Sequence, residues 1–297
     1  MGGATGQGIL WERGDIVAQG QSSIEFSRVP TPMVKVKRST VPTLEVSAAA
    51  HTDRGLRRAE NQDNILSTVA PHGAMGIFAV ADGMGGQRAG EVASAIAIET
   101  LRAELLPLVE EDAAGSAADA TDRPLAEWVR DAIAECNGRI LRHADEHPDT
   151  RGLGSTLTLA LVKGSLAIIG NIGDSRTYRV RGDAIESLTR DHSYVAHLAA
   201  IGQIQPDEVY RHPQRSLIYR ALGTEAEAQP DIFTERLQSG DTLVLCSDGL
   251  WEMVRDDHIL RAVNESATPD EIAVRLIELA NHNGGEDNIS VIVVRAQ

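Results

Sequence analysis

Four short apolar runs follow one another in the middle of the chain with almost no residues between them. These expected strands cover residues 155–162, 165–171, 175–181 and 184–188. The gaps contain the turn-forming pairs Lys163-Gly164, Gly173-Asp174 and Gly182-Asp183. Parallel strands need a crossover of a dozen or more residues, so gaps this short predict hairpins of an antiparallel sheet.

Strands and helices are grouped in blocks along the rest of the chain. Further strands are expected at residues 44–50, 64–69, 75–81, 231–235, 241–246 and 289–294. Helices are expected over 88–106, over 124–145, and from the capping box Thr268-Pro269-Asp270-Glu271 onward. In the first of these helices, one buried face would hold Val92, Ala93, Ile96, Leu101 and Leu105. The grouping favours an α+β layered domain over a doubly wound fold.

Residues 1–43 differ in composition from the rest of the chain. They are rich in Gly, Ser, Gln and Pro, so we expect a flexible leader before one domain over residues 44–297. The leader holds five basic and three acidic residues, which leaves 23 basic against 40 acidic residues, or −17, in the domain. Most of that acidity is explained by dispersed surface charge, although a site for divalent cations would also concentrate Asp and Glu.

Composition also excludes several classes of function. A formal charge of −15 argues against a nucleic-acid partner, because such binding depends on Lys and Arg. No stretch is apolar enough to cross a bilayer and no signal peptide is evident, so the expected location is cytoplasmic, away from membranes. Only Cys136 and Cys246 are present, far apart, and a disulfide framework is not expected.

Aspartates recur where the expected strands begin or end. They are Asp63, Asp82, Asp174, Asp248 and Asp287. A single Asp-Gly pair is usually no more than a turn, but the recurrence suggests that these carboxylates converge on one edge of the sheets. A site made only of oxygen ligands selects Mg²⁺ or Mn²⁺ over Zn²⁺.

Eight motifs, taken in order and spacing, resemble those of the metal-dependent protein phosphatase family of type 2C in its bacterial form. They are DRGLRRAENQD (53–63), DGMGG with GEVAS (82–86 and 90–94), GSTL (154–157), GDSR (173–176), LTRDHS (188–193), HPQR (212–215), CSDGLW (246–251) and GEDN (285–288). The resemblance spans about residues 44–295 and makes residues 44–297 the expected catalytic domain.

The resemblance implies a four-layer α-β-β-α fold, an antiparallel β-sandwich flanked by helices, with two or three Mg²⁺ or Mn²⁺ ions in a cleft at one edge. In that arrangement Asp82 bridges two ions and the carbonyl of Gly83 ligates one of them. Asp248 and Asp287 complete the ligands of the first ion. Asp174 together with Asp248 matches the residues that hold a third, more weakly bound ion.

The resemblance also implies a mechanism. Arg58 matches the arginine that grips the substrate phosphate, a task that suits a planar guanidinium, and we assign Arg58 and Asp63 to catalysis. A hydroxide shared by the metals would attack phosphorus in line, without a phosphoenzyme. The stretch 191–215 resembles the family's flap, where we expect substrate specificity to be set.

Two positions depart from patterns common in the family. Gln62 stands where many relatives have Glu, so a contact made there is neutral and metal affinity is expected to be lower. Met84 stands where eukaryotic relatives have a His proposed as general acid, so the leaving group must take its proton from elsewhere.

Two other chemistries have weaker support. Cys136 and Arg142 have the Cys-x₅-Arg spacing of cysteine-dependent tyrosine phosphatases, but the residues between them resemble an amphipathic helix. His192, His197, His212 and His282 include no pair with convincing metal-ligand spacing.

The leading hypothesis is a monomeric protein phosphatase that acts on phosphoserine and phosphothreonine and opposes Ser/Thr kinases in signalling. Its expected partners are phosphorylated proteins, either the kinases or their substrates. Two alternatives stay open: a pseudophosphatase that binds phosphoproteins without turnover, and a hydrolase of small phosphate esters.

Overall fold

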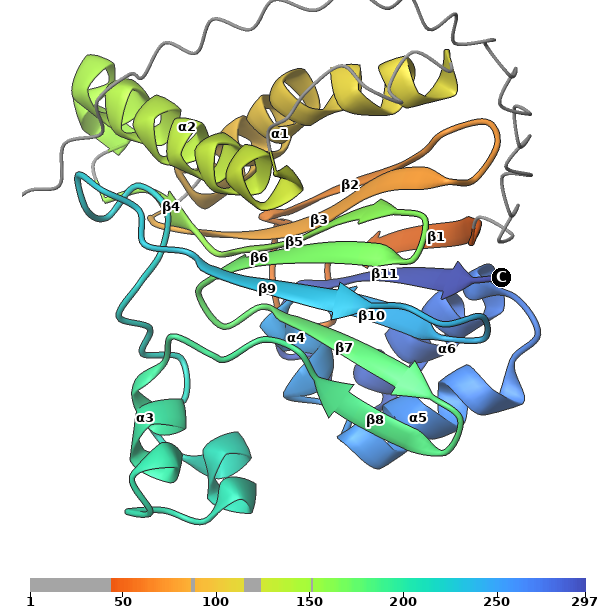
Figure 1. The fold of residues 1–297 in the computed structure, drawn as a ribbon. Helices are drawn as coiled ribbons and strands as arrows, with labels where there is room; N and C mark the ends of the chain where they lie inside the picture. Colours follow the sequence, from red (N-terminus) through yellow and green to blue (C-terminus); the bar gives the residue numbers. More distant parts are fainter. Residues whose placement is uncertain (1–43, 87–88, 115–123, 151) are drawn as a thin grey trace, which may run out of the picture. The chain divides into compact units, whose positions relative to one another are not determined.

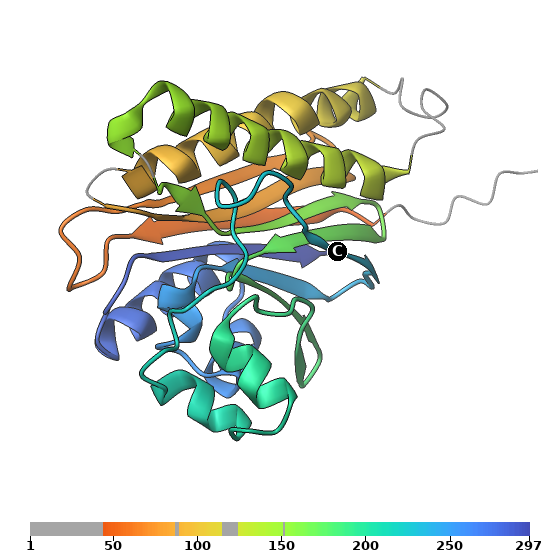
Figure 2. The ribbon, with the colours of Figure 1, turned by 90° about the vertical axis from the view of Figure 1, so that its left-hand side faces the viewer.

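Two antiparallel sheets stack face to face, and helices cover the outer face of each (Figure 1). The same four layers are seen after a quarter turn (Figure 2). This computed structural model describes residues 44–86, 89–114, 124–150 and 152–297. The expected leader, residues 1–43, lies outside the described residues, as does most of the loop expected at 113–123. The α+β sandwich implied by the motifs is confirmed.

The first sheet has five strands and contains the C-terminal strand of the chain. In spatial order they are β1 (Val46–Asp53), β11 (Ile289–Ala296), β10 (Thr242–Cys246), β7 (Arg176–Arg181) and β8 (Ala184–Ser187). Every neighbouring pair is antiparallel. The inner strand β11 carries Val291, Ile292, Val293 and Val294, all buried, as expected for a strand covered on both faces.

The second sheet has six strands, of which one is very short. In spatial order they are β2 (Asp63–Val69), β3 (Met75–Met84), β5 (Leu157–Lys163), β6 (Leu166–Ile172) and β9 (Asp231–Arg236), with β4 (Gly154–Ser155) paired to the end of β3. Residues Phe78, Val80, Ala160 and Ile169 from this sheet meet residues of the first sheet in a core between the two.

Two long helices cover the second sheet, and shorter helices cover the first (Figure 1). The long ones are α1 (Ala89–Ala113) and α2 (Leu125–Glu146). The first sheet is covered by α4 (Asp248–Trp251), α5 (Asp256–Glu265) and α6 (Pro269–His282). The flap contains α3 (Tyr194–Ala200) and the 3₁₀ turn η2 (Pro206–Arg211), and a second 3₁₀ turn, η1 (Pro148–Thr150), follows α2.

Most expected elements occur close to their expected positions. The capping box at Thr268 is present, with the Thr268 side chain accepting from Glu271 N–H. Helix α1 runs to Ala113, past the expected end at residue 106, with Pro107 inside it. Its expected buried face is confirmed, since Ala93, Leu101 and Leu105 are buried while Val92 and Ile96 are partly buried against the same core. Helices α3, α4 and α5 were not expected.

The Gly173-Asp174 turn does not close a hairpin, which corrects the expectation from its length. Strand β6 pairs with β5 and β9, whereas β7 pairs with β10 and β8 in the other sheet. Gly173 has φ +104, and a Cβ there would lie 2.6 Å from Thr156 Cβ. Only glycine fits this left-handed, crowded position, so the turn carries the chain between sheets and leaves Asp174 at their common end.

The Cys-x₅-Arg spacing falls inside helix α2, so it forms no phosphate loop. Burial raises the pKa of the Cys136 thiol to about 12, which keeps it protonated at neutral pH. Cys246 is also buried, and both cysteines are free.

Helix α2 is held on the second sheet by apolar side chains that fit over Gly170 of β6. Ile133 is fully buried, and its Cδ1 would lie 2.6 Å from a Cβ at Gly170. We expect Ile133→Ala to lower the free energy of unfolding by about 2–5 kcal/mol, because it leaves a cavity in the core. Urea denaturation measures this, with Val274→Ala as the exposed control, expected to cost less than about 1 kcal/mol. A cost for Ile133→Ala no larger than the control would contradict this packing.

Candidate active site

The antiparallel topology places the aspartate-bearing strand ends at one end of both sheets. In the second sheet Asp63, the first residue of β2, pairs with Asp82 near the end of β3. In the first sheet the last residue of β10, Cys246, pairs with the first residue of β7, Arg176. Asp248 therefore follows β10 at the same end where Asp174 precedes β7. Neighbouring antiparallel strands begin and end alternately at one edge, so residues far apart in the sequence meet there.

A cleft of about 210 Å³ opens at this end of the sandwich. It is lined by Arg58, Gln62, Asp82, Gly83, Met84, Gly85, Thr156, Asp174, Ser216, Ile218, Asp248, Asp287 and Asn288. Six of the seven residues expected at the site are among them. The seventh, Asp63, is buried and does not line the cleft.

Mutual repulsion and burial govern the charge state of the clustered carboxyl groups. Burial, followed by neighbouring carboxylates, raises the pKa of Asp82 and of Asp248 well above its usual range. Burial raises the pKa of Asp174 to about 7. These shifts indicate that the protein alone does not neutralise the negative charge of the site. In the described part of the chain, few cationic side chains line the cleft.

Asp63 lies behind the cleft. Its Oδ2 accepts a hydrogen bond from Ser247 Oγ at 2.8 Å, and its backbone faces Asp82 across the β2–β3 ladder. Burial raises its pKa to about 6. This position supports Asp82 and the segment that leads to Asp248, and it gives Asp63 no direct contact with a ligand in the cleft.

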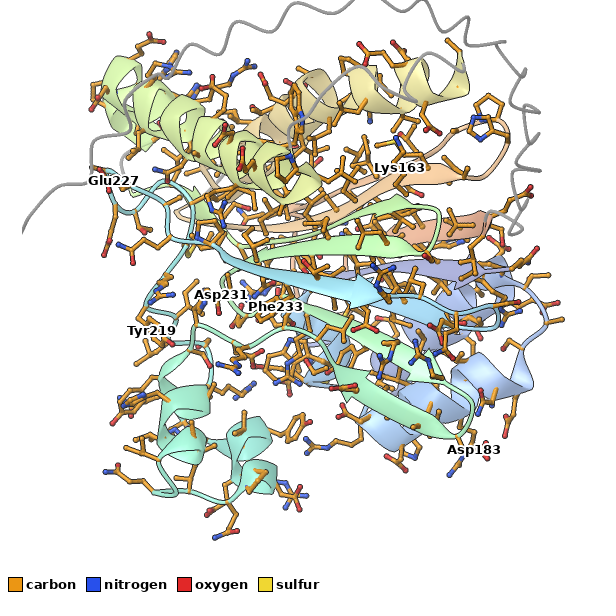
Figure 3. All side chains as sticks on the ribbon, in the orientation of Figure 1. Lys163, Asp183, Tyr219, Glu227, Asp231 and Phe233 are labelled. Carbon is orange, nitrogen blue, oxygen red and sulfur yellow. The ribbon has the colours of Figure 1, made fainter. Side chains whose placement is uncertain are left out.

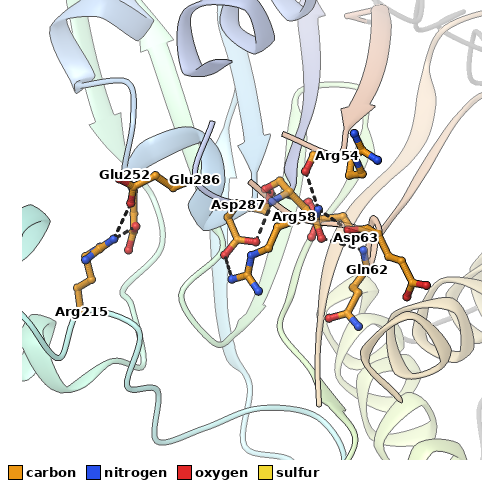
Figure 4. Close-up of polar contacts among 11 residues, drawn as sticks. Arg54, Arg58, Gln62, Asp63, Arg215, Glu252, Glu286 and Asp287 are labelled. Atoms are coloured by element: carbon orange, nitrogen blue, oxygen red, sulfur yellow. Dashed lines mark hydrogen bonds and ion pairs between the residues drawn. The ribbon is translucent and has the colours of Figure 1, made fainter. Parts of the chain in front are cut away.

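Arg58 lies beside the carboxylates on the loop between β1 and β2 (Figure 4). Its Nη2 donates to Asp287 Oδ2 at 2.5 Å, and the Arg58 side chain is 54% exposed. The guanidinium is therefore both anchored at the cleft and open to an incoming anion. Arg57, the next residue in the chain, is exposed and does not line the cleft.

Asn288 fixes the Arg58 loop to Asp287, and sequence reasoning missed this role. Its Nδ2 donates to the carbonyls of Arg54 and Glu60 at 2.9 Å each, and its Oδ1 accepts from Gln62 N–H at 2.8 Å. All three contacts belong to the segment on either side of Arg58. The available signal was its position in the GEDN motif, directly after Asp287.

Close backbone packing holds the end of β3. A Cβ at Gly83 would lie 2.0 Å from the Gly90 carbonyl oxygen, so the start of α1 touches this strand end directly. Ser94 strengthens the contact by donating to the Gln62 carbonyl at 2.6 Å. The glycines and the serine of GEVAS therefore serve the cleft through packing.

A second set of buried contacts fixes Asp174. Trp251 Nε1 donates to the Asp174 carbonyl at 2.9 Å, and the Arg176 guanidinium lies 3.6 Å from the Trp251 ring centroid. His192 is buried and its Nδ1 accepts from Gly173 N–H at 3.2 Å, so its role at this turn is structural.

The flap is attached to the segments that carry two of the aspartates. Arg215 Nε donates to Glu252 at 2.8 Å and its Nη2 donates to Glu286 at 2.9 Å (Figure 4). Glu252 follows α4, which begins at Asp248, and Glu286 precedes Asp287. Ser216 and Ile218 then form one wall of the cleft.

The donor set suits hard divalent cations. Among the described residues the buried oxygen Asp248 Oδ1 has no hydrogen-bond partner, and an ion or its water shell would satisfy such an atom. Within the described ranges, no three His, Cys, Asp or Glu side chains are arranged to hold one ion as they stand. Mg²⁺ commonly binds through one or two carboxylates and keeps several waters, so the spread-out carboxylates fit hydrated ions.

Comparison with known proteins agrees with the fold. The family model for protein phosphatase 2C matches residues 49–273. The serine/threonine phosphatase stp of Listeria innocua is 37% identical over 247 residues, covering 83% of this chain and 94% of the relative. The serine/threonine protein phosphatase PstP of Mycobacterium tuberculosis is 40% identical over 84% of this chain, which spans 45% of that relative.

Solved structures show the same architecture. The catalytic domain of PstP in complex with two manganese ions superposes with a TM-score of 0.72 at 36% identity, covering 86% of this chain and 99% of that one. Stp1 from Staphylococcus aureus gives 0.74 at 33% identity, with coverage of 85% and 95%. The chain therefore belongs to the protein phosphatase 2C family.

The raised carboxyl pKa values predict an unusual pH dependence of stability in metal-free protein. Asp63 and Asp174 have pKa values of about 6 and about 7 when folded, above those of unfolded carboxyl groups. The folded chain therefore binds more protons than the unfolded chain between about pH 4 and 7. The stability that the two protonated carboxyl groups contribute falls as pH rises through this range.

We expect chemical denaturation in EDTA to give a free energy of unfolding higher at pH 5.5 than at pH 7.5 by about 1–3 kcal/mol from these groups. Asp63→Asn removes one titrating group and should flatten the pH profile, whereas exposed Asp257→Asn should not. Identical profiles for wild type and Asp63→Asn would count against the assignment.

Proposed function

We propose that this chain is a metal-dependent phosphatase of phosphoserine and phosphothreonine in proteins, with Asp82, Gly83, Asp174, Asp248 and Asp287 holding two or three Mg²⁺ or Mn²⁺ ions. The observation that carries the proposal is the cleft in which these residues meet beside Arg58. Bound divalent cations would supply activation of water and screening of phosphate charge.

The chain's own residues bind and orient the phosphate group. The exposed Arg58 guanidinium can donate two parallel hydrogen bonds to phosphate oxygens, since its anchor on Asp287 uses only one of its nitrogens. Asn288 holds the loop on both sides of Arg58, which fixes the distance from the guanidinium to the carboxylates. We assign Asp63 a positioning role, because it supports Asp82 and Ser247 from behind the cleft.

Two positions shape proton transfer and metal affinity. Met84 and Gln62 both line the cleft. Met84 has no titratable group, so the leaving alkoxide must be protonated by solvent or by another group in the cleft. Gln62 adds no charge, so the carboxylates of the site carry the whole attraction for cations.

Two alternatives have less support. The relatives of this chain are named as phosphatases, which gives no support to a pseudophosphatase. A hydrolase of small phosphate esters is disfavoured, because the relatives' names specify serine/threonine phosphatases.

The same proposal covers the domain, the substrates and the location of the protein. Residues 44–297 would form the catalytic domain, and its substrates would be phosphorylated proteins, among them Ser/Thr kinases or their targets. We propose a monomer that acts in the cytoplasm. Among the described residues no helix is long and apolar enough to cross a membrane.

Phosphate release from a phosphothreonine peptide, with and without Mn²⁺, tests the proposal. We expect turnover only with the metal. Asp248→Asn should reduce it about 100-fold or more, because it removes a charged oxygen at the cation site. Arg58→Ala should lower kcat/KM roughly 10- to 100-fold, because it removes a charge-assisted contact with phosphate.

Two neighbouring variants serve as controls. Arg57→Ala removes an exposed arginine, and Asp257→Asn neutralises an exposed aspartate; neither residue lines the cleft. Both should keep wild-type kcat/KM. Wild-type protein that binds the peptide but releases no phosphate with any divalent cation would favour the pseudophosphatase.

A further inference from the structure

A second pocket, here called the flap pocket, is lined by residues of the flap together with Arg176 at the start of β7 and Ser187 at the end of β8. Its volume is about 560 Å³, which is within the range of sites that bind small groups. The walls are largely apolar: the flap contributes Ala196, Ala199, Pro206, Val209 and Tyr210, and Tyr219 follows the flap in the chain. Exposing such a surface to water costs free energy, so the pocket favours an apolar occupant.

The polar floor of the flap pocket leaves one positive charge available. Arg176 is paired there with Asp191, with its Nε and Nη2 donating at 2.9 and 2.7 Å, so these two charges cancel. Arg190 also lines the pocket and is exposed. Within the described part of the chain no carboxylate forms an ion pair with the Arg190 guanidinium. The pocket therefore favours a negative group beside an apolar one. This local preference contrasts with the formal charge of the whole chain, which is −15.

The wall between the flap pocket and the cleft is formed by residues 216–219. Ser216 and Ile218 line the cleft, whereas Tyr219 lines the flap pocket. Ile218 and Tyr219 are neighbours in the chain, so the two pockets approach each other at this wall. Hydrogen bonds hold the wall in place, since Tyr219 N–H donates to the His192 carbonyl at 2.8 Å and Ile218 forms a bridge with Ser193.

The wall is narrow enough for one peptide to reach both sides. A segment bound with its phosphate in the cleft needs only a few residues to cross this wall, because the adjacent residues Ile218 and Tyr219 line the two pockets. Tyr219 stands 52% exposed on the far side of that crossing, near the base of the flap (Figure 3). A side chain from the same peptide can then enter the flap pocket against Tyr219 and Val209.

We propose that the flap pocket binds an aromatic or branched apolar side chain of the phosphoprotein substrate, with an adjacent acidic residue paired to Arg190. The proposal rests on the phosphatase function and adds to it a preference in substrate sequence. An apolar residue without the acid would fill the walls but leave Arg190 unpaired, and a basic neighbour would be repelled.

A set of phosphothreonine peptides tests the preference. A Phe-Glu pair is moved one residue at a time along either side of phosphothreonine in a Gly-Ser peptide, and kcat/KM is measured with Mn²⁺. We expect a gain of about tenfold at one or two neighbouring positions, as burial of a Phe side chain would give. Equal values at every position, with the plain peptide still hydrolysed, would overturn this inference and leave the phosphatase function intact. Failure to hydrolyse any peptide would reject both.

Two variants connect the preference to the pocket. Ala199→Trp fills the pocket and should abolish the gain, whereas Ile201→Trp, at a 53% exposed position outside the lining, should retain it. Arg190→Glu should transfer the preference from Phe-Glu to Phe-Lys peptides. This last result is a gain, so a misfolded variant cannot imitate it, and an unchanged preference for Phe-Glu would contradict the pairing.

Binding without turnover gives a separate readout. A fluorescein-labelled, unphosphorylated peptide with Phe-Glu at the preferred position is titrated with wild-type protein in EDTA, and anisotropy is recorded. We expect binding that weakens about tenfold in Ala199→Trp and in Arg190→Glu, but not in Ile201→Trp. Equal affinities in all four proteins would place the peptide elsewhere.

Discussion

Repulsion among aspartates held together at one end of two sheets is the constraint on which the rest of this structure depends. Asp82 and Asp248 are each pushed toward their protonated forms by burial and by the carboxylates around them. Arg58 is the cation that pairs with a carboxylate of the cleft, through Asp287. A protein that keeps such a cluster gives up stability for it unless divalent cations bind.

The fold supports that cluster with rigid parts from many segments. Strand ends set the approximate positions of the aspartates, and buried hydrogen bonds fix these positions and that of Arg58 more closely. Asn288 fixes the Arg58 loop, Trp251 holds the carbonyl of Asp174, and Ser247 holds Asp63. These donors and acceptors are largely buried, so removing one would leave its partner unsatisfied in a region with little access to water.

Short turns between strands and repeated strand-end aspartates are local signals, from which the sequence predicted an α+β layered domain and a convergence of carboxylates. The four layers, Arg58 and Gly83 came from the resemblance to type 2C phosphatases. Prediction from the sequence failed where distant segments decide the outcome. The Gly173 turn looked like a hairpin, but crowding by Thr156 and the pairing of β7 with β10 make it a crossing between sheets. Asp63 shares the strand-end signal, yet the β2–β3 register buries it behind Asp82. The clamp made by Asn288 depends on contacts across more than two hundred residues, which no local pattern contains.

Calorimetric titration of the metal-free chain with Mn²⁺ tests most directly whether these aspartates form a cation site. We expect at least two bound ions per chain and release of protons on binding at pH 6.5, because Asp174 has a pKa of about 7 without metal. Asp82→Asn should abolish the tight binding, since its carboxylate lies among all the others. A wild-type chain that binds no Mn²⁺, or an Asp82→Asn variant that binds as tightly as wild type, would contradict the assignment.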